Sequence, residues 1–141
     1  MIFTRLWHID LIPYLPDSQL KAQWRELNSI FKKKDKHILI NYIYKYTKDY
    51  LYVYTMKVME EMRIRKFKIN KLDNFNKYFK DIDLFKGIPA LLRFKEHDLD
   101  YLTICYYNLK EKYIRGQKDF DEKTWHRLDM YYKSRINLKG E

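Results

Sequence analysis

Residues 16–31 read PDSQLKAQWRELNSIF, and this stretch decides the fold class. A helix is predicted to begin just after Pro16, because Asp17 or Ser18 can accept a hydrogen bond from the free N–H groups of a first turn. Apolar side chains then recur at three- and four-residue steps, which is the spacing of one helix face. They are Leu20, Trp24, Leu27 and Phe31.

The other half of this predicted helix carries polar or small side chains, namely Gln19, Ala22, Arg25, Glu26 and Ser29. An adjacent Arg-Glu pair on a helix is usually a solvated surface pair. The basic run FKKKDKH at residues 31–37 ends the helix. Its cations complement the negative end of the helix dipole, and they are also available to phosphate groups.

The regions around this helix are less regular. Residues 1–15 are predicted to form an irregular arm, and residues 38–46 fit either a period-two strand pattern or a buried helical turn. A second helix is predicted over residues 48–66, with Thr47 as its cap. Residues 67–96 are mixed, with a loop at Gly87 and Pro89.

A third helix is predicted between Asp98, a good N-cap, and Gly116, which stops it. A short fourth helix is expected over residues 121–133. We therefore predict a mainly α fold, a compact single-domain bundle of three main helices plus a short fourth, with aromatic-rich loops. The single domain spans residues 1–141. The rows of tyrosine and methionine side chains on these helices more often pack in a hydrophobic core than bind a ligand.

Composition supports helices and an intracellular location. The 141 residues include only three glycines and three prolines, which disfavours a many-stranded sandwich. The single cysteine, Cys105, cannot form an intrachain disulfide, and a buried inert thiol is favoured over a nucleophile. We expect no signal peptide and no membrane span, and hence a cytoplasmic protein.

The charge points to a polyanionic partner. Lysine and arginine number 29 against 19 acidic residues, giving a net charge of +10 and a pI near 9.5. Aromatic residues make up 18% of the chain, and rings interleaved with cations can stack on bases. An AT-rich genome also enriches lysine and tyrosine, so a basic protein-interaction module stays an alternative.

Common catalytic signatures are absent from the sequence. There is no glycine-rich phosphate loop and no GxSxG motif. The four histidines, His8, His37, His97 and His126, are scattered, and only His8 and Asp10 form a weak metal-binding pattern. We expect neither a metal nor a cofactor.

Several short motifs carry a family resemblance. They are TRL at residues 4–6, the WREL run at residues 24–27, Lys36-His37 after the lysine-rich turn, and the segment from Tyr50 to Ile69. Over residues 4–69 the chain resembles the pyrimidine-dimer DNA glycosylases. The phrases RLWH at residues 5–8 and MEEM at residues 59–62 resemble an uncharacterised bacterial branch of that family still more closely.

The resemblance implies a glycosylase that is also an abasic-site lyase acting on UV pyrimidine dimers. An N-terminal amine, on the residue matching Thr4, attacks the sugar C1′, and Glu26 is the catalytic carboxylate. Arg5 and Arg25 would contact phosphate and lesion, while Lys36 and His37 would lie in a DNA-facing loop. The partner would be double-stranded DNA containing damaged bases, bound by a monomer.

Three departures from the family pattern stand out. Ile2 follows Met1, so the methionine should be retained and the free amine should sit on Met1, before Thr4. Three alternatives follow: the true start of the protein differs, Met1 still reaches the site, or the lyase activity is lost. Ser18 and Ser29 replace a family glutamine and a family arginine. Lys21 is a fallback amine, and a non-catalytic nucleic-acid-binding relative of the same fold is the alternative function.

Overall fold

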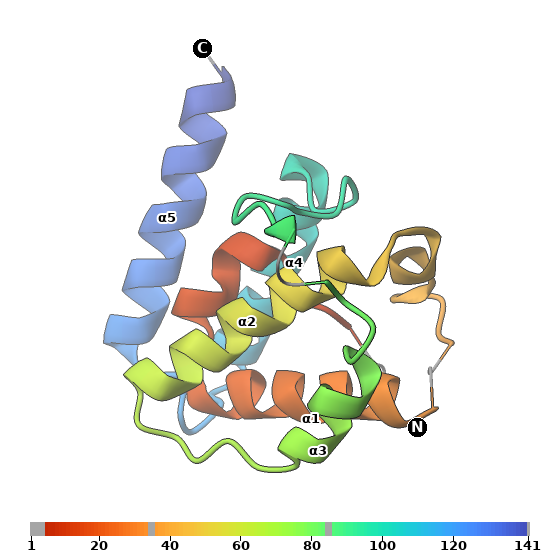
Figure 1. The fold of residues 1–141 in the computed structure, drawn as a ribbon. Helices are drawn as coiled ribbons and strands as arrows, with labels where there is room; N and C mark the ends of the chain where they lie inside the picture. The colour runs from red at the N-terminus through yellow and green to blue at the C-terminus, as the bar shows by residue number, and fades with distance from the viewer. Residues whose placement is uncertain (1–4, 34–35, 84–85, 141) are drawn as a thin grey trace.

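The computed structural model describes residues 5–33, 36–83 and 86–140. Every regular element in these ranges is a helix, so the predicted mainly α class is confirmed (Figure 1). Two are short 3-10 helices, η1 and η2, and five are α-helices. In chain order they are η1 (Ile9–Tyr14), α1 (Asp17–Lys33), η2 (Asn41–Lys45), α2 (Lys48–Ile64), α3 (Leu72–Tyr78), α4 (Leu99–Ile114) and α5 (Glu122–Gly140).

The helices form two packed groups joined by η1. In one group α1 packs against α2 and α3, and in the other α4 packs against α5. The short η1 touches both α2 and α5 and so connects the groups. Figure 1 shows α2 crossing above α1, while α5 stands at the edge and its C-terminal turns extend past the other helices.

The N-terminal arm forms part of the core, and the prediction that residues 1–15 are irregular was wrong for η1. Leu6, Leu11 and Leu15 are fully buried within one continuous hydrophobic cluster. The side chain of His8 accepts a hydrogen bond from the Asp10 N–H at 3.1 Å and so caps η1. A six-residue 3-10 helix with Pro13 inside it is too short to show the period of 3.6 residues, which is why the pattern missed it.

Local features explain the segment before α2 and the two ends of α2. Residues 41–45 form η2, so the helical-turn alternative for residues 38–46 is the correct one. The helix α2 begins after Thr47 as predicted, although the Thr47 side chain makes no capping bond. It ends at Ile64 rather than residue 66, because Lys66 adopts a left-handed conformation with φ of 63°.

The predicted ends of α4 are confirmed. The side chain of Asp98 accepts a hydrogen bond from the Tyr101 N–H at 2.9 Å, as an N-cap should. Gly116, with φ of 84°, lies just beyond the last turn, where a residue with a Cβ would be strained. Both ends were predictable because a capping carboxylate and a glycine in the left-handed region are local features.

Two helices differ from the predictions. The mixed region 67–96 contains α3, a helix of 7 residues, and the last helix is not short but spans 19 residues. The fully buried apolar side chains of α5 end at Tyr132, which stacks on Tyr106 of α4, and after it Ile136 is half-buried. Beyond that point the helix continues through residues that favour helix, without proline, as far as Gly140. In the described residues, no helix has the length and apolarity that crossing a bilayer demands.

Candidate active site

A pocket of about 520 Å³ opens between the arm, α1 and α4. The volume lies in the range of small-ligand sites. Its lining mixes two cations, one carboxylate, three side-chain amides and apolar walls. The lining residues are Arg5, Trp7, Gln19, Ala22, Gln23, Glu26, Leu39, Asn108 and Lys112. Gln19, Ala22, Gln23 and Glu26 come from one side of α1, because they are three or four residues apart or adjacent.

Gln23 fixes the arm against α1. Its Oε1 accepts hydrogen bonds from the Trp7 N–H at 2.8 Å and from the Tyr54 hydroxyl at 2.8 Å. Its Nε2 donates to the Arg5 carbonyl at 2.9 Å. Gln23 is 1% exposed, and these bonds satisfy both acceptor sites of its amide oxygen and one of its two N–H donors. The backbone of Arg5 therefore has a defined position one helical turn from Glu26.

Aromatic rings hold the Arg5 side chain. Its guanidinium carbon lies 5.6 Å from the Trp7 ring centre and 5.9 Å from that of Tyr101, distances at which a cation is attracted to a ring face. The Tyr101 hydroxyl donates to the Leu6 carbonyl at 2.5 Å. Burial raises the pKa of Tyr101 and of the nearby Cys105 thiol, so both remain protonated at neutral pH. Cys105 is fully buried, as predicted for an inert thiol.

The loop between α4 and α5 holds the start of α1. A carboxylate oxygen of Asp119 accepts from the Ser18 N–H at 2.7 Å, and Gln117 Nε2 donates to Gln19 Oε1 at 2.7 Å. The prediction that Asp17 or Ser18 caps α1 was wrong. The carboxylate that accepts a hydrogen bond from the first turn belongs to Asp119, 101 residues further along the chain than Ser18. A contact of that separation leaves no local signal in the sequence.

The structure brings together some of the predicted site residues. Glu26 and Arg5 line the pocket, whereas Arg25 is exposed on α1 and does not. Lys36 is exposed and His37 is half-buried, two residues before Leu39, which does line it. Met1 and Thr4 lie outside the described residues. Lys21 is exposed and its ammonium sits 4.4 Å from the centre of the Phe67 ring; it is not part of the pocket lining.

Sequence reasoning gave no site role to the other seven lining residues, which are Trp7, Gln19, Ala22, Gln23, Leu39, Asn108 and Lys112. Gln23 carried a weak signal, since it is a polar residue next to Trp24 in the apolar half of a helix. Asn108 and Lys112 carried none, because they belong to a helix that is distant in sequence. Only the tertiary packing of the arm against α4 brings them to Glu26.

A second group of polar side chains lies in the core behind the arm. His8 and His97 stack with ring centres 5.4 Å apart, and both are nearly fully buried. Burial lowers the pKa of His97 to about 3 and also lowers that of His8. Asp10 pairs with Arg93 at 2.7 Å. Across the described part of the chain, no three histidine, cysteine or acidic side chains gather as a metal site would require.

A family model described as pyrimidine dimer DNA glycosylase matches residues 4–75, just over half of the 141 residues. The chain belongs to this family. The matched segment carries Arg5, Gln23 and Glu26, so the arm and α1 side of the pocket falls within it. Membership makes the protein, in general terms, a DNA repair glycosylase. No curated protein and no solved structure matches the chain.

Proposed function

We propose that this protein excises UV pyrimidine dimers from double-stranded DNA and cleaves the resulting abasic site, using an N-terminal amine and Glu26. The observation that carries the proposal is the pocket in which Glu26 faces the same space as Arg5, at the point where the N-terminal segment reaches α1. The family match over residues 4–75 supplies the reaction class.

The position of Arg5 supports an amine nucleophile. A trans peptide separates neighbouring Cα atoms by about 3.8 Å, so an amine on Thr4 stays within one residue of the pocket wall. Counted from Arg5, the amine of Met1 has a reach of roughly 14 Å at full extension. An α-amino group ordinarily titrates at about 7.7–8.0, so a useful fraction is neutral and nucleophilic near pH 7.

The reaction then needs one carboxylate. The amine nitrogen forms a bond to C1′ as the N-glycosidic bond breaks, and the base leaves with a proton. Ring opening gives an imine, and loss of a C2′ proton expels the 3′ phosphate. Glu26 stabilises the cationic sugar and moves these protons, which is the work of a positioned carboxylate in a site of this kind. A damaged base is also easier to extrude from the stack than a sound one.

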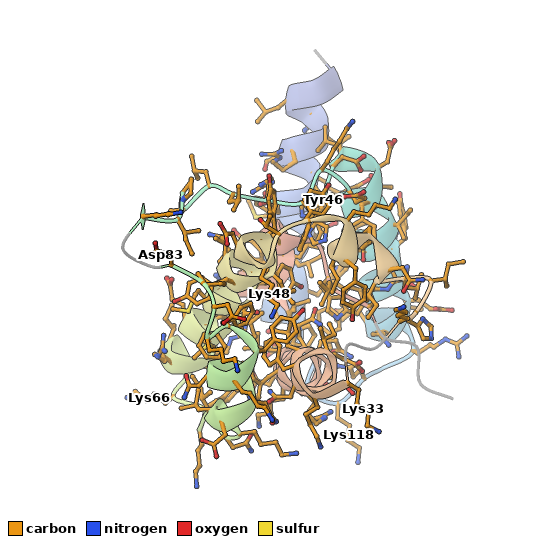
Figure 2. All side chains as sticks on the ribbon, turned by 45° about the vertical axis from the view of Figure 1, so that its right-hand side comes forward. Lys33, Tyr46, Lys48, Lys66, Asp83 and Lys118 are labelled. Carbon is orange, nitrogen blue, oxygen red and sulfur yellow. The ribbon has the colours of Figure 1, made fainter. Side chains whose placement is uncertain are left out.

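The surface charge favours the DNA partner. The net charge of +10 attracts the phosphate backbone without reading sequence. In Figure 2 the exposed Lys33, at the end of α1, and the exposed Lys118 project from the lower side of the molecule. We assign Arg25, Lys36 and His37 to contacts with the duplex outside the pocket, and Arg5 to a contact within it.

Borohydride trapping on UV-irradiated duplex DNA tests the proposal. Reduction should freeze the imine as a covalent adduct, and peptide mass spectrometry should place it on the N-terminal residue, whether that is Met1 or another start. Undamaged duplex is the control and should give no adduct. Tight, salt-sensitive binding without any adduct or strand cleavage would instead identify a non-catalytic DNA-binding relative.

A further inference from the structure

The N-terminal arm runs beside the pocket in one defined register. Arg5 and Trp7 line the pocket, whereas Leu6 and His8 are buried in the core. This is the alternation expected of an extended chain, in which successive side chains point to opposite sides. A slip by one residue would exchange the two sides and bury the guanidinium of Arg5. The groups that fix this register therefore also fix how the chain before Arg5 approaches Glu26.

Side chains from several helices hold the backbone of the arm. On the side of α1 and α2, Gln23 bonds to the Arg5 carbonyl and the Trp7 N–H, and the Tyr54 hydroxyl donates to the Trp7 carbonyl at 2.6 Å. From α4, the Tyr101 hydroxyl donates to the carbonyl of the residue between them at 2.5 Å. Three successive carbonyls are thus bound by partners on three different helices. A shift of the arm along its own axis would break all of these bonds together.

Tyr101 also holds the side chain that carries the charge of the arm. The guanidinium carbon of Arg5 lies 5.6 Å from the ring centre of Trp7 and 5.9 Å from that of Tyr101. The Tyr101 ring packs in turn against the buried His97, with ring centres 5.2 Å apart, and the Nδ1 of His97 accepts the Ile9 N–H at 3.1 Å. One side chain of α4 therefore fixes both a backbone carbonyl and a cation of the arm.

We propose that Tyr101 is a positioning residue, whose hydroxyl and ring set the register in which the N-terminal amine meets Glu26. This inference rests on the proposed function for the role of that amine. Tyr101 is not among the residues that line the pocket, so it acts through Leu6 and Arg5 and not on the substrate itself. It belongs to α4, beyond the matched residues 4–75, so the family match says nothing about it.

The rate of the reaction should depend on this register much more than the affinity for DNA does. Attack on C1′ requires a reacting distance of about 3–3.5 Å in a defined direction, and a misplacement of about 1 Å can cost about 10²-fold in rate. The affinity depends mainly on the attraction between the net charge of +10 and the phosphate backbone. Loosening the arm should therefore slow the chemistry and largely spare binding.

The test compares Tyr101→Phe, which removes the hydroxyl bond and keeps the ring, with Tyr101→Leu, which removes both. Borohydride trapping on a duplex with a preformed abasic site, at saturating protein, gives the single-turnover rate of adduct formation. We expect this rate to fall about tenfold in Tyr101→Phe and about 10²-fold in Tyr101→Leu. The dissociation constant of Tyr101→Phe for a duplex with a non-cleavable abasic-site analogue should stay within about threefold of wild type.

The matched control is Tyr106→Phe. It removes a hydroxyl bond, in this case to Asp129, from another tyrosine of the same helix, and it should keep the full rate of adduct formation. Melting curves of all three variants show how much of each protein is folded at the temperature of the assay.

The outcomes separate this inference from the proposed function. Equal adduct rates for wild type and Tyr101→Phe would overturn the positioning role and leave the proposed function intact. Equal losses in Tyr101→Phe and Tyr106→Phe would also overturn it, because the cause would then be general stability. A loss of affinity as large as the loss of rate would make Tyr101 a binding residue instead. A wild type that binds the analogue and forms no adduct would reject the amine chemistry, and the role of Tyr101 with it.

Discussion

The two halves of the molecule bury polar groups in different ways. Two hydrogen bonds of Gln23 join the arm to α1, and a third ties Gln23 to Tyr54 of α2, so that a backbone is fixed beside Glu26. The α4–α5 half is joined by stacked rings: Tyr106 lies 3.9 Å from Tyr132 and 5.4 Å from Trp125. Directional bonds set positions to within a fraction of an ångström, whereas stacking tolerates sliding.

Residues that position the site and residues that fill the core therefore make different kinds of contact. A buried amide that ties three backbone or hydroxyl groups is costly to desolvate, and it is retained where position matters. We therefore expect substitutions at the pocket-lining residues of the arm and α1 to change activity, and substitutions in the α4–α5 stack to change stability alone. Asn108 and Lys112 lie on α4 but line the pocket, so they fall outside this expectation.

The largest effect is expected at Glu26. Glu26→Gln keeps the shape and removes the charge, so incision of UV-irradiated duplex should fall by about 10²-fold or more, while binding survives. Single-turnover incision and a binding titration measure the two quantities separately. Glu60→Gln, on an exposed position of α2, is the control and should keep full activity. Undiminished incision by the Glu26 variant would remove this carboxylate from the mechanism.

Gln23→Leu should have the next largest effect. It strands the buried Trp7 N–H, while the Tyr54 hydroxyl keeps its bond to the Trp7 carbonyl at 2.6 Å, and we expect a loss of about 1–3 kcal/mol in the free energy of unfolding. The arm should also shift, so incision per folded molecule should fall. Urea unfolding and incision below the transition measure both.

Asn28→Leu is the matched control for Gln23, because Asn28 is a buried amide on the same helix that bonds to Trp24 and Asn74 away from the pocket. It should lower stability and leave incision by the folded protein unchanged. If both variants lose incision equally, buried amides on α1 act through general stability, and the contrast between the halves fails.

Acid should destabilise the protein through His97. Its Nδ1 accepts the Ile9 N–H at 3.1 Å, so the proton sits on Nε2, which meets the Tyr42 hydroxyl at 2.6 Å. Protonating Nδ1 would place its N–H against the Ile9 N–H, and two donors cannot form a hydrogen bond with each other. Because burial lowers the pKa of His97 to about 3, its neutral form contributes full stability above about pH 6.5, and this is lost as pH falls toward 3.

The expected loss from His97 is about 2 kcal/mol between pH 7 and pH 5. His97→Gln should flatten this dependence, whereas His126→Gln, at an exposed position on α5, should not. Chemical denaturation at several pH values gives the slope. A slope that is the same in wild type and in His97→Gln would place the acid-sensitive group elsewhere, with the buried His8 as the next candidate.

Local signals explain how much was predictable from sequence. The apolar step of α1 and the cap at Asp98 depend on residues within a few positions, and both were confirmed. The family motifs also led to Glu26 and Arg5, which do share a pocket. The catalytic role of Glu26 and the phosphate contact of Arg5 stay predictions, as do the DNA contacts of Arg25, Lys36 and His37.

The features that could not be predicted depend on distant partners. Asp119 meets the first turn of α1, and Lys112 meets the pocket, across about a hundred residues and across two helical groups. The arm lacks a helical period because η1 is a 3-10 helix, yet most of its apolar side chains are buried. The last turns of α5 carry no apolar stripe, because Ile136 is half-buried against the core whereas Leu138 is exposed.

The smallest effect tests the stacked half. The Tyr106 hydroxyl donates to an Asp129 carboxylate oxygen, and Tyr106→Phe removes only that bond while keeping the ring against Tyr132. We expect a loss of about 1 kcal/mol in urea unfolding, with incision by the folded protein unchanged. Tyr107→Phe, on the exposed neighbour, should stay within about 0.5 kcal/mol of wild type. A fall in incision for Tyr106→Phe at full folding would mean that the α4–α5 stack also sets the geometry of the pocket.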